Sequence, residues 1–172
     1  MTISLKPVLS RLGALALIAA AAHPAAAQSG GDGATPPPEP WAVQCSGAGR
    51  NAALECAMEQ RIVNKQNGAV LARMVIRKSA SANNAAFMIH VPLRTLLTEG
   101  LKVSVDSKPI AQLPFQTCDP QGCYAGGQIT ADMLTAMKAG NGAIVEFADN
   151  GRRPILLEFS LRGFTKAFGD IQ

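Results

Sequence analysis

Residues 54–77 alternate between apolar and polar side chains with a period of two. The apolar parity consists of Leu54, Cys56, Met58 and Ile62 in the first segment and of Val70, Ala72, Met74 and Ile76 in the second. The other parity contains Glu55, Glu59 and Arg61 in the first segment and Leu71, Arg73, Val75 and Arg77 in the second. This period is typical of β-strands that bury one face. Asn67-Gly68 lies between the segments and favours a tight turn, so we predict a β-hairpin.

A hairpin centred on Gln66 gives a register in which both faces agree. The predicted pairs are Cys56–Ile76 and Met58–Met74 on the core side, and Glu55–Arg77 and Glu59–Arg73 on the water side. Apolar pairs and pairs of opposite charge across neighbouring strands both stabilise a sheet. We therefore predict this register, with two ion pairs on the outer surface.

Further short strands follow at regular spacing. The segments are Ala86–Val91, Leu101–Val105, Ile110–Phe115, Ala143–Phe147 and Ile155–Leu161. One segment, Thr130–Ala139, has helical spacing instead, with Met133 and Met137 on one face. Thr130 is suited to cap its start and Gly140 to end it. Seven or eight strands with one short helix predict a mainly β fold, an antiparallel β-sandwich.

The N-terminus has the features of an export signal. Lys6 and Arg11 are positive, the apolar run Leu12–Ala22 follows, and Ala25-Ala26-Ala27 offers small residues for a signal peptidase. The run of 11 residues is shorter than the roughly 20 that span a bilayer. We predict that residues 1–27 form a signal peptide cleaved after Ala27, that no transmembrane segment remains, and that the protein is periplasmic or secreted.

Residues 28–40 (QSGGDGATPPPEP) offer almost no apolar side chain to bury. Their Gly and Pro content predicts a disordered linker, so the folded domain is expected over residues 41–172. Removing Lys6 and Arg11 from the 16 basic residues leaves 14 against 12 acidic residues, a net charge of +2. This charge is too weak to predict binding to nucleic acid.

All four cysteines, Cys45, Cys56, Cys118 and Cys123, lie in the predicted domain. In an exported chain an even number predicts disulfides, and four cysteines allow three pairings. The turn-rich residues 47–51, with a reversal between Arg50 and Asn51, place Cys45 opposite Cys56, and Pro120 with Gly122 favours a turn between the other two. We therefore predict the pairs 45–56 and 118–123. On the chain-entropy model each contributes about 2–3 kcal/mol.

Two chemical uses of these cysteines are less consistent with the sequence. A redox-active pair is typically Cys-x-x-Cys at the start of a helix, whereas four residues separate Cys118 from Cys123 and no helix begins there. A four-cysteine zinc site typically has two Cys-x-x-Cys knuckles, which are absent from the sequence. We expect no cofactor and no metal.

Landmarks along residues 41–168 resemble the invasion-associated locus B proteins of Gram-negative bacteria. They are Trp41-x-Val43-x-Cys45, Cys56, Pro92, Leu97, Gly100-Leu101, Val103-x-Val105-Asp106, Leu113-Pro114-Phe115-x-x-Cys118, Gly122-Cys123-x-Ala125 and Ser160-Leu161-x-Gly163-Phe164-x-x-Ala167. The sequence departs at Arg94, where the family has a small residue, often Gly. The resemblance implies an immunoglobulin-like sandwich without known catalytic residues, and a role in host-cell interaction.

We predict no catalytic residue. His90 would be the only histidine after signal cleavage, and its parity opposite Phe87 and Ile89 predicts a surface side chain. The carboxylates Asp106, Asp119 and Asp149 lie at predicted turns, where Asp commonly accepts backbone hydrogen bonds. Trp41 follows the parity of Val43 and Cys45 and is expected in the core.

Basic residues could form a patch for an anionic ligand. They are Arg61, Lys65, Arg73, Arg77 and Lys78. The predicted register pairs Arg73 with Glu59 and Arg77 with Glu55, which favours a solvated sheet face over a binding patch.

Three functions therefore remain open. The first is a non-enzymatic binding module of the periplasm or cell surface, with an unidentified protein or envelope partner. The second is a structural factor for envelope integrity without a dedicated ligand. The third, a thiol–disulfide enzyme, is the least consistent with the cysteine spacing.

Overall fold

The computed structural model describes residues 40–47, 54–78 and 84–171. The predicted signal peptide, the predicted linker up to residue 39 and the Arg50–Asn51 reversal lie outside these ranges. Two antiparallel sheets account for the strands of the described residues. The larger sheet contains, in spatial order, β1 (Ala42–Ser46), β2 (Glu55–Val63), β3 (Val70–Lys78), β4 (Ala85–Val91), β8 (Gly122–Gln128) and β7 (Phe115–Asp119). The smaller contains β10 (Pro154–Ser160), β9 (Gly142–Ala148), β5 (Leu101–Val105) and β6 (Lys108–Leu113).

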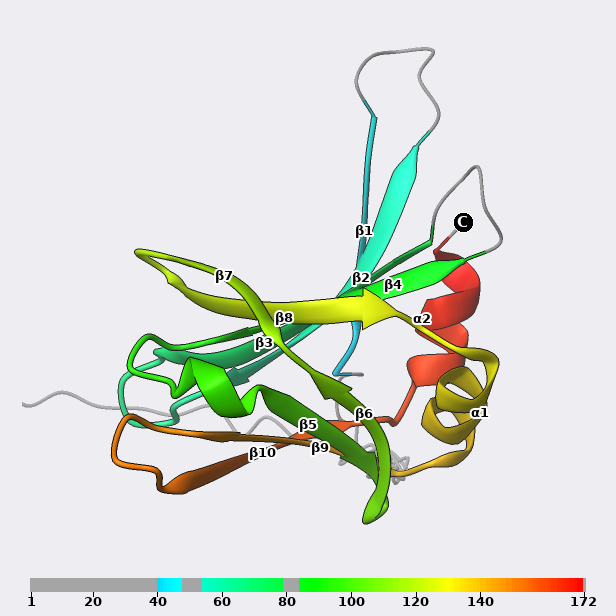
Figure 1. Ribbon diagram of the computed structural model, residues 1–172. Helices are drawn as coiled ribbons and strands as arrows, with labels where there is room; N and C mark the ends of the chain where they lie inside the picture. The colour runs from blue at the N-terminus through cyan, green and yellow to red at the C-terminus, as the bar shows by residue number, and fades with distance from the viewer. Residues whose placement is uncertain (1–39, 48–53, 79–83, 172) are drawn as a thin grey trace, which may run out of the picture. The chain divides into compact units, whose positions relative to one another are not determined.

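The core lies between the two sheets, where apolar positions of alternating parity meet. From the six-stranded sheet come Met58, Met74, Ile76, Phe87, Ile89 and Ala125, and from the four-stranded sheet Leu101, Val103, Val145 and Phe159. The mainly β, antiparallel sandwich predicted from the period of two is thus confirmed (Figure 1). Burial of these apolar surfaces is the main favourable term in its stability.

Along one side of the sandwich, strand β2 is joined to strand β10 by a buried side-chain amide. Gln60 is only 6% exposed, and its Nε2 donates to the Ser160 carbonyl oxygen while its Oε1 accepts from the Ser160 N–H, each at 2.8 Å. The Trp41 indole N–H donates to the same carbonyl at 2.8 Å. Gln60 therefore acts as a peptide group would, satisfying backbone groups of Ser160 that would be costly to bury unpaired.

The β2–β3 register differs from the prediction by two residues. Met58 faces Ile76, and Gln60 faces Met74. The turn pairs Val63 with Val70, which accounts for one step, and an irregularity between Ile62 and Val63 adds the second. A shift of two keeps every side chain on its predicted face. The predicted pairs Cys56–Ile76 and Met58–Met74 are therefore wrong, although the assignment of Met58, Met74 and Ile76 to the core is confirmed.

The structure contains a second helix, which was not predicted from the sequence. Helix α1 (Ala131–Ala139) begins as expected, with the Thr130 hydroxyl accepting from the Met133 N–H at 3.2 Å. Helix α2 (Phe164–Asp170) follows Gly163, and it packs beside α1 at one end of the sheets (Figure 1). Its apolar residues Phe164, Ala167 and Phe168 have helical spacing and are buried. Within the described residues, neither helix is long and apolar enough to cross a membrane.

The chain near Pro114 also differs from the prediction. The expected single strand Ile110–Phe115 ends at Leu113, and β7 starts at Phe115 in the other sheet. Pro114 has no N–H to donate to a ladder, which suits a residue at which the chain changes sheets. Strand β8 was not predicted, because Gly122, Gly126 and Gly127 interrupt its alternation. It nevertheless pairs with β4 and β7.

Arg94 lies where the resemblance places a small residue. Its φ is +71°, in the left-handed region that favours glycine. The Arg94 carbonyl accepts a hydrogen bond from the Asn150 N–H at 2.9 Å, and the next residue, Thr95, forms a β-bridge with Asp149. Arg94 therefore adopts a backbone conformation that favours glycine.

Candidate binding surface

The outer face of the six-stranded sheet carries aligned rows of side chains, because paired residues on neighbouring strands point the same way. One row runs across Arg61, Arg73, His90, Tyr124 and Thr117. The next row runs across Glu59, Val75, Met88 and Gly126. We call the solvent side of these strands the outer face. A polar row with two guanidinium groups thus borders a mostly apolar row.

Met88 is the most exposed apolar side chain of this row, at 42%. Its neighbours across the strands are Val75 on one side and Gly126 on the other. Because Gly126 has no side chain, its position on β8 contributes no side chain to cover Met88. The outer face therefore offers apolar surface at its centre.

The charges on this face are unevenly paired. Glu59 lies between two guanidinium groups, 2.6 Å from Arg61 Nη2 and 3.8 Å from Arg73 Nε. The predicted Glu59–Arg73 contact is present, although the two residues are not directly opposite. The predicted Glu55–Arg77 pair is wrong, because Arg77 faces Ala57 in the actual register. Within the described residues Arg77 has no ion pair.

Two adjoining hollows lie on the outer face. The first, which we call the Met88 hollow, has a volume of about 470 Å³ and is lined by Arg73, Val75, Arg77, Ala86, Phe87, Met88, Thr117, Asp119 and Tyr124. The second has a volume of about 530 Å³ and is lined by Arg61, Val70, Arg73, His90, Gln121 and Tyr124. Both volumes fall within the range of roughly 300–1,000 Å³ typical of ligand sites. The two share Arg73 and Tyr124.

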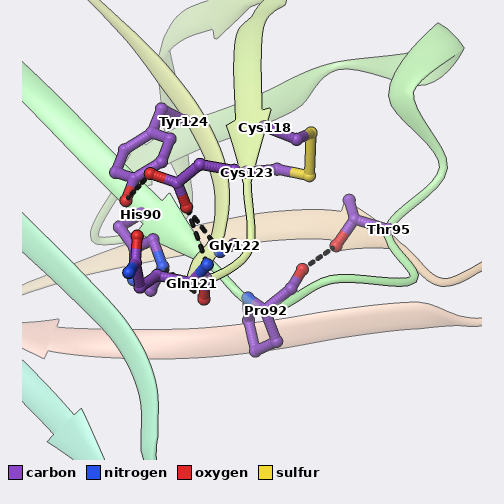
Figure 2. Close-up of a disulfide and its surroundings, with 9 residues drawn as sticks. His90, Pro92, Thr95, Cys118, Gln121, Gly122, Cys123 and Tyr124 are labelled. Carbon is purple, nitrogen blue, oxygen red and sulfur yellow. Dashed lines mark hydrogen bonds between the residues drawn. A yellow bond between two sulfur atoms is a disulfide. The ribbon is translucent and has the colours of Figure 1, made fainter.

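The β7–β8 turn forms one end of this surface and is held by side chains. Asp119 Oδ1 accepts from the backbone N–H groups of Gln121 and Gly122 at 2.8 and 3.1 Å, and Oδ2 accepts from the Tyr124 hydroxyl at 3.0 Å. His90 Nε2 lies 3.0 Å from the Gln121 carbonyl oxygen. Figure 2 shows His90 and Tyr124 on one side of the turn and the disulfide on the other. The turn therefore fixes Tyr124 at the edge of both hollows.

These contacts change the acidity of both partners. Desolvation alone would raise the pKa of Asp119, but hydrogen bonds from Gln121, Tyr124 and Gly122, with the nearby His90, outweigh it and lower the pKa. The hydrogen bond to Asp119 raises the pKa of Tyr124, and desolvation and the carboxylate charge add to the effect. Asp119 is therefore an anion, and Tyr124 a neutral hydrogen-bond donor, at neutral pH.

Gly122 allows the His90 ring to lie against the turn. Its φ is +157°, and a Cβ at this position would collide with the His90 ring and the Val91 carbonyl oxygen. The close approach therefore requires glycine at position 122.

The four cysteines form the disulfides Cys45–Cys56 and Cys118–Cys123, and no cysteine is free. These are the two pairs expected from the turn chemistry. In each, the partners are directly opposite on neighbouring antiparallel strands. The structure thus places them at the two edges of the six-stranded sheet.

The other predicted residues have structural contacts. Trp41 is buried, and its ring packs edge-on against the ring of Phe164, with 5.4 Å between the ring centroids. Its predicted place in the core is therefore confirmed. The Asp106 carboxylate accepts from the N–H groups of Asn141 and Gly142. The carboxylate of Asp149 accepts from the N–H groups of Gly151 and Arg153 and forms an ion pair with the Arg153 guanidinium. Backbone bonding by these turn aspartates, as expected, is confirmed.

Tyr124, Met88 and Thr117 were not predicted from the sequence to form part of a surface. Tyr124 lies on β8, whose glycines concealed its alternation. Once β8 is known, the parity of buried Cys123 and Ala125 places Tyr124 on the outer face. Met88 had the same parity as His90, so the signal for its exposure was available from the sequence.

Comparisons with known proteins give concordant matches. The sequence model described as "Invasion associated locus B (IalB) protein" matches residues 41–172. Two invasion protein B homologues of Brucella abortus, from strain 2308 and from biovar 1 strain 9-941, are each 29% identical over 133 residues, which cover 77% of this chain and 75% of each relative.

A solved structure has the same fold. It is the crystal structure of invasion associated protein B from Bartonella henselae, with a TM-score of 0.67 and 24% sequence identity. The match covers 76% of this chain and 90% of that chain. At this identity the likeness supports the arrangement of strands and helices, and no more.

Proposed function

Because the chain belongs to the invasion-associated locus B family, we propose that it is an exported, non-enzymatic binding module that presents its outer face to a partner. The name of the family and of its relatives supports a role in invasion or host-cell interaction. The partner is a protein or another component of the envelope or cell surface.

The exposed centre of the outer face is the observation that carries this proposal. Met88 is 42% exposed between Val75 and Gly126, which has no side chain. It lines one hollow, which adjoins a second hollow at Arg73 and Tyr124. Apolar surface rimmed by polar residues is characteristic of interaction sites.

The contacts of the reactive side chains support a non-enzymatic role. Both cysteine pairs are oxidised, which suits an oxidising compartment. The His90 ring is engaged with the Gln121 carbonyl. Asp106, Asp119 and Asp149 accept backbone hydrogen bonds at turns. Each of these groups has a structural task.

Export rests on residues 1–27, with periplasmic or extracellular location after cleavage at Ala27. The mature protein, isolated from the native bacterium, should begin at Gln28 when its N-terminus is sequenced. Recovery of an intact N-terminus in the membrane fraction would contradict the export proposal.

Capture from envelope fractions tests the binding role. The mature wild-type chain should retain a partner at constant stoichiometry, and Met88→Glu should lose it because a charge then replaces exposed apolar surface. Leu156→Glu is the matched control, since Leu156 is 58% exposed on β10 of the other sheet. Thermal melts of all three proteins check that the fold is retained.

Two outcomes would overturn the proposal. In the first, Met88→Glu captures the same partner as the wild type does. In the second, no partner is retained by any variant, while deletion of the gene reduces resistance of the cells to detergent. The second outcome would favour a structural factor for envelope integrity.

A further inference from the structure

We infer that the Met88 hollow binds an amphipathic monoanion, a single carboxylate joined to an unbranched hydrocarbon tail. This inference rests on the proposed binding function and names the chemistry of its ligand. The lining of the hollow supplies an apolar floor for the tail and, for the carboxylate, a guanidinium that has no ion pair among the described residues.

The floor of the hollow suits a hydrocarbon tail. Val75 on β3 and Ala86 and Met88 on β4 all project from the outer face, and the first and last are directly paired across the strands. Neighbouring strands are about 4.8 Å apart, so the surface from β3 to β8 extends about 10 Å. An unbranched tail lying along this floor would cover the exposed part of Met88, which is adaptable in shape.

Arg77 is the group that would bind the carboxylate. It lines the hollow and has no ion pair within the described residues, whereas Arg73 shares Glu59 with Arg61. A guanidinium presents its N–H groups as a planar fork that matches the two oxygens of a carboxylate. Its position on β3, beside Ala86 on β4, lies at the border of the apolar floor.

The charge of the lining favours a monoanion. Two guanidinium groups and one carboxylate, Asp119, line the hollow, which gives a net charge of +1. Asp119 already accepts three hydrogen bonds from its own turn and from Tyr124, so it remains an anion that repels a second negative charge. A phosphate monoester carries about −1.5 to −2 charges at neutral pH and would exceed what this lining neutralises.

Titration calorimetry with sodium decanoate, below its micelle-forming concentration, tests the inference on the mature chain. Decanoate should bind with one-to-one stoichiometry. Decyltrimethylammonium has an unbranched tail of similar length with the opposite charge, and acetate has the carboxylate without the tail, so neither should bind. Arg77→Gln should weaken decanoate binding about tenfold or more, which corresponds to about 1.4 kcal/mol.

Lys102→Gln is the matched control for loss of one positive charge. Lys102 is an exposed residue of the four-stranded sheet, paired with Glu146 at 3.5 Å, and its replacement should leave decanoate binding unchanged. Met88→Glu should abolish binding through both the lost floor and the added charge. Equal affinity of the wild type and Arg77→Gln would overturn the assignment, as would equal binding of decyltrimethylammonium.

The remaining outcomes separate this inference from others. Binding to vesicles of phosphatidylglycerol without binding of free decanoate would indicate a membrane surface as the ligand and overturn the inference. Dimerisation that depends on Met88, with no decanoate binding, would assign the hollow to a second copy. If decanoate fails while Met88-dependent capture of a partner persists, the inference is wrong and the proposed function stands.

Discussion

Two short disulfides join antiparallel neighbours at opposite edges of the six-stranded sheet. Cys45–Cys56 joins β1 to β2, and Cys118–Cys123 joins β7 to β8. Both link residues that are directly opposite in their ladders. The bonds are chemically the same, but their surroundings differ.

At the first edge, among the described residues, the bonded segment is held mainly by its pairing with β2 and by the disulfide. All five residues of β1 are exposed. Trp41 anchors the chain immediately before β1 through its buried ring and its hydrogen bond to Ser160. Toward the disulfide, the strand has backbone pairing with β2 and the covalent bond.

At the second edge, the turn has a network of its own. The Asp119 carboxylate accepts hydrogen bonds from the N–H groups of Gln121 and Gly122 and from the Tyr124 hydroxyl. His90 contacts the Gln121 carbonyl oxygen (Figure 2). The disulfide is therefore one of several constraints on the β7–β8 turn. Because other contacts hold the same turn, the native conformation of the β7–β8 turn depends less on its disulfide than the end of β1 does.

The largest effect is expected on removing the first disulfide. Its ends are 11 residues apart, and on the chain-entropy model Cys45→Ser with Cys56→Ser lowers the free energy of unfolding by about 3 kcal/mol. Amide hydrogen exchange in β1 should also quicken, because the strand then opens locally. Urea denaturation measures the first effect. A loss smaller than that of the 118–123 variant would contradict the comparison.

A smaller loss is expected on removing the second disulfide. Its ends are five residues apart, so Cys118→Ser with Cys123→Ser lowers the free energy of unfolding by about 2 kcal/mol. The Asp119 network should keep Tyr124 in place, and partner binding at low temperature should persist. Thiol-oxidase or isomerase activity in the wild type that disappears in this variant, with the fold unchanged, would instead favour an enzyme.

Gly122→Ala should disrupt the contacts of the β7–β8 turn while leaving both disulfides intact. The added Cβ collides with the His90 ring and the Val91 carbonyl, and we expect a loss of about 1–2 kcal/mol because the ring can move and the backbone cannot. Gly127→Ala on the same strand is the control, since its Cβ would meet only Leu113 at 3.6 Å. Thermal melts compare the two. Equal losses would mean that the close approach to His90 is unimportant.

The two disulfide-bonded pairs and the β2–β3 hairpin also differ in how far the sequence predicts them. Local information was enough for the disulfide pairs, because short loops with turn residues bring each pair together. The faces of Met58 and Met74 were predicted as well, since parity survives a shift of two residues. The register itself was not, because the irregularity at Ile62–Val63 leaves no trace in the alternation.

The parts that were missed depend on contacts between residues far apart in the sequence. Gln60 has the parity of the core, yet its bond partner Ser160 is 100 residues away. The network around Asp119 includes His90 from another strand. The register places Arg77 opposite Ala57, and Arg77 has no ion pair in the described part of the chain. Helix α2 is the exception, because the apolar spacing of Phe164, Ala167 and Phe168 was visible in the sequence.

The smallest expected effect is on the stability of the protein at acidic pH. It tests the hydrogen bonds of Asp119 separately from the disulfide. The pKa of Asp119 in the folded chain is below its ordinary value of 3.8, so the unfolded state binds more protons as the pH falls through this range. The resulting stability is fully present above about pH 5 and is lost as the pH falls through the folded pKa. Asp119→Asn should therefore flatten the fall in stability between about pH 5 and pH 3, measured by urea denaturation at each pH.

Asp149→Asn should flatten it as well, because the backbone and side chain of Arg153 lower the pKa of Asp149, but without affecting the β7–β8 turn. The same flattening by Asp119→Asn should appear in the Cys118→Ser, Cys123→Ser variant, since the hydrogen bonds do not involve sulfur. If the effect of Asp119→Asn disappears in that variant, the network depends on the disulfide, and the two edges of the sheet are held in the same way.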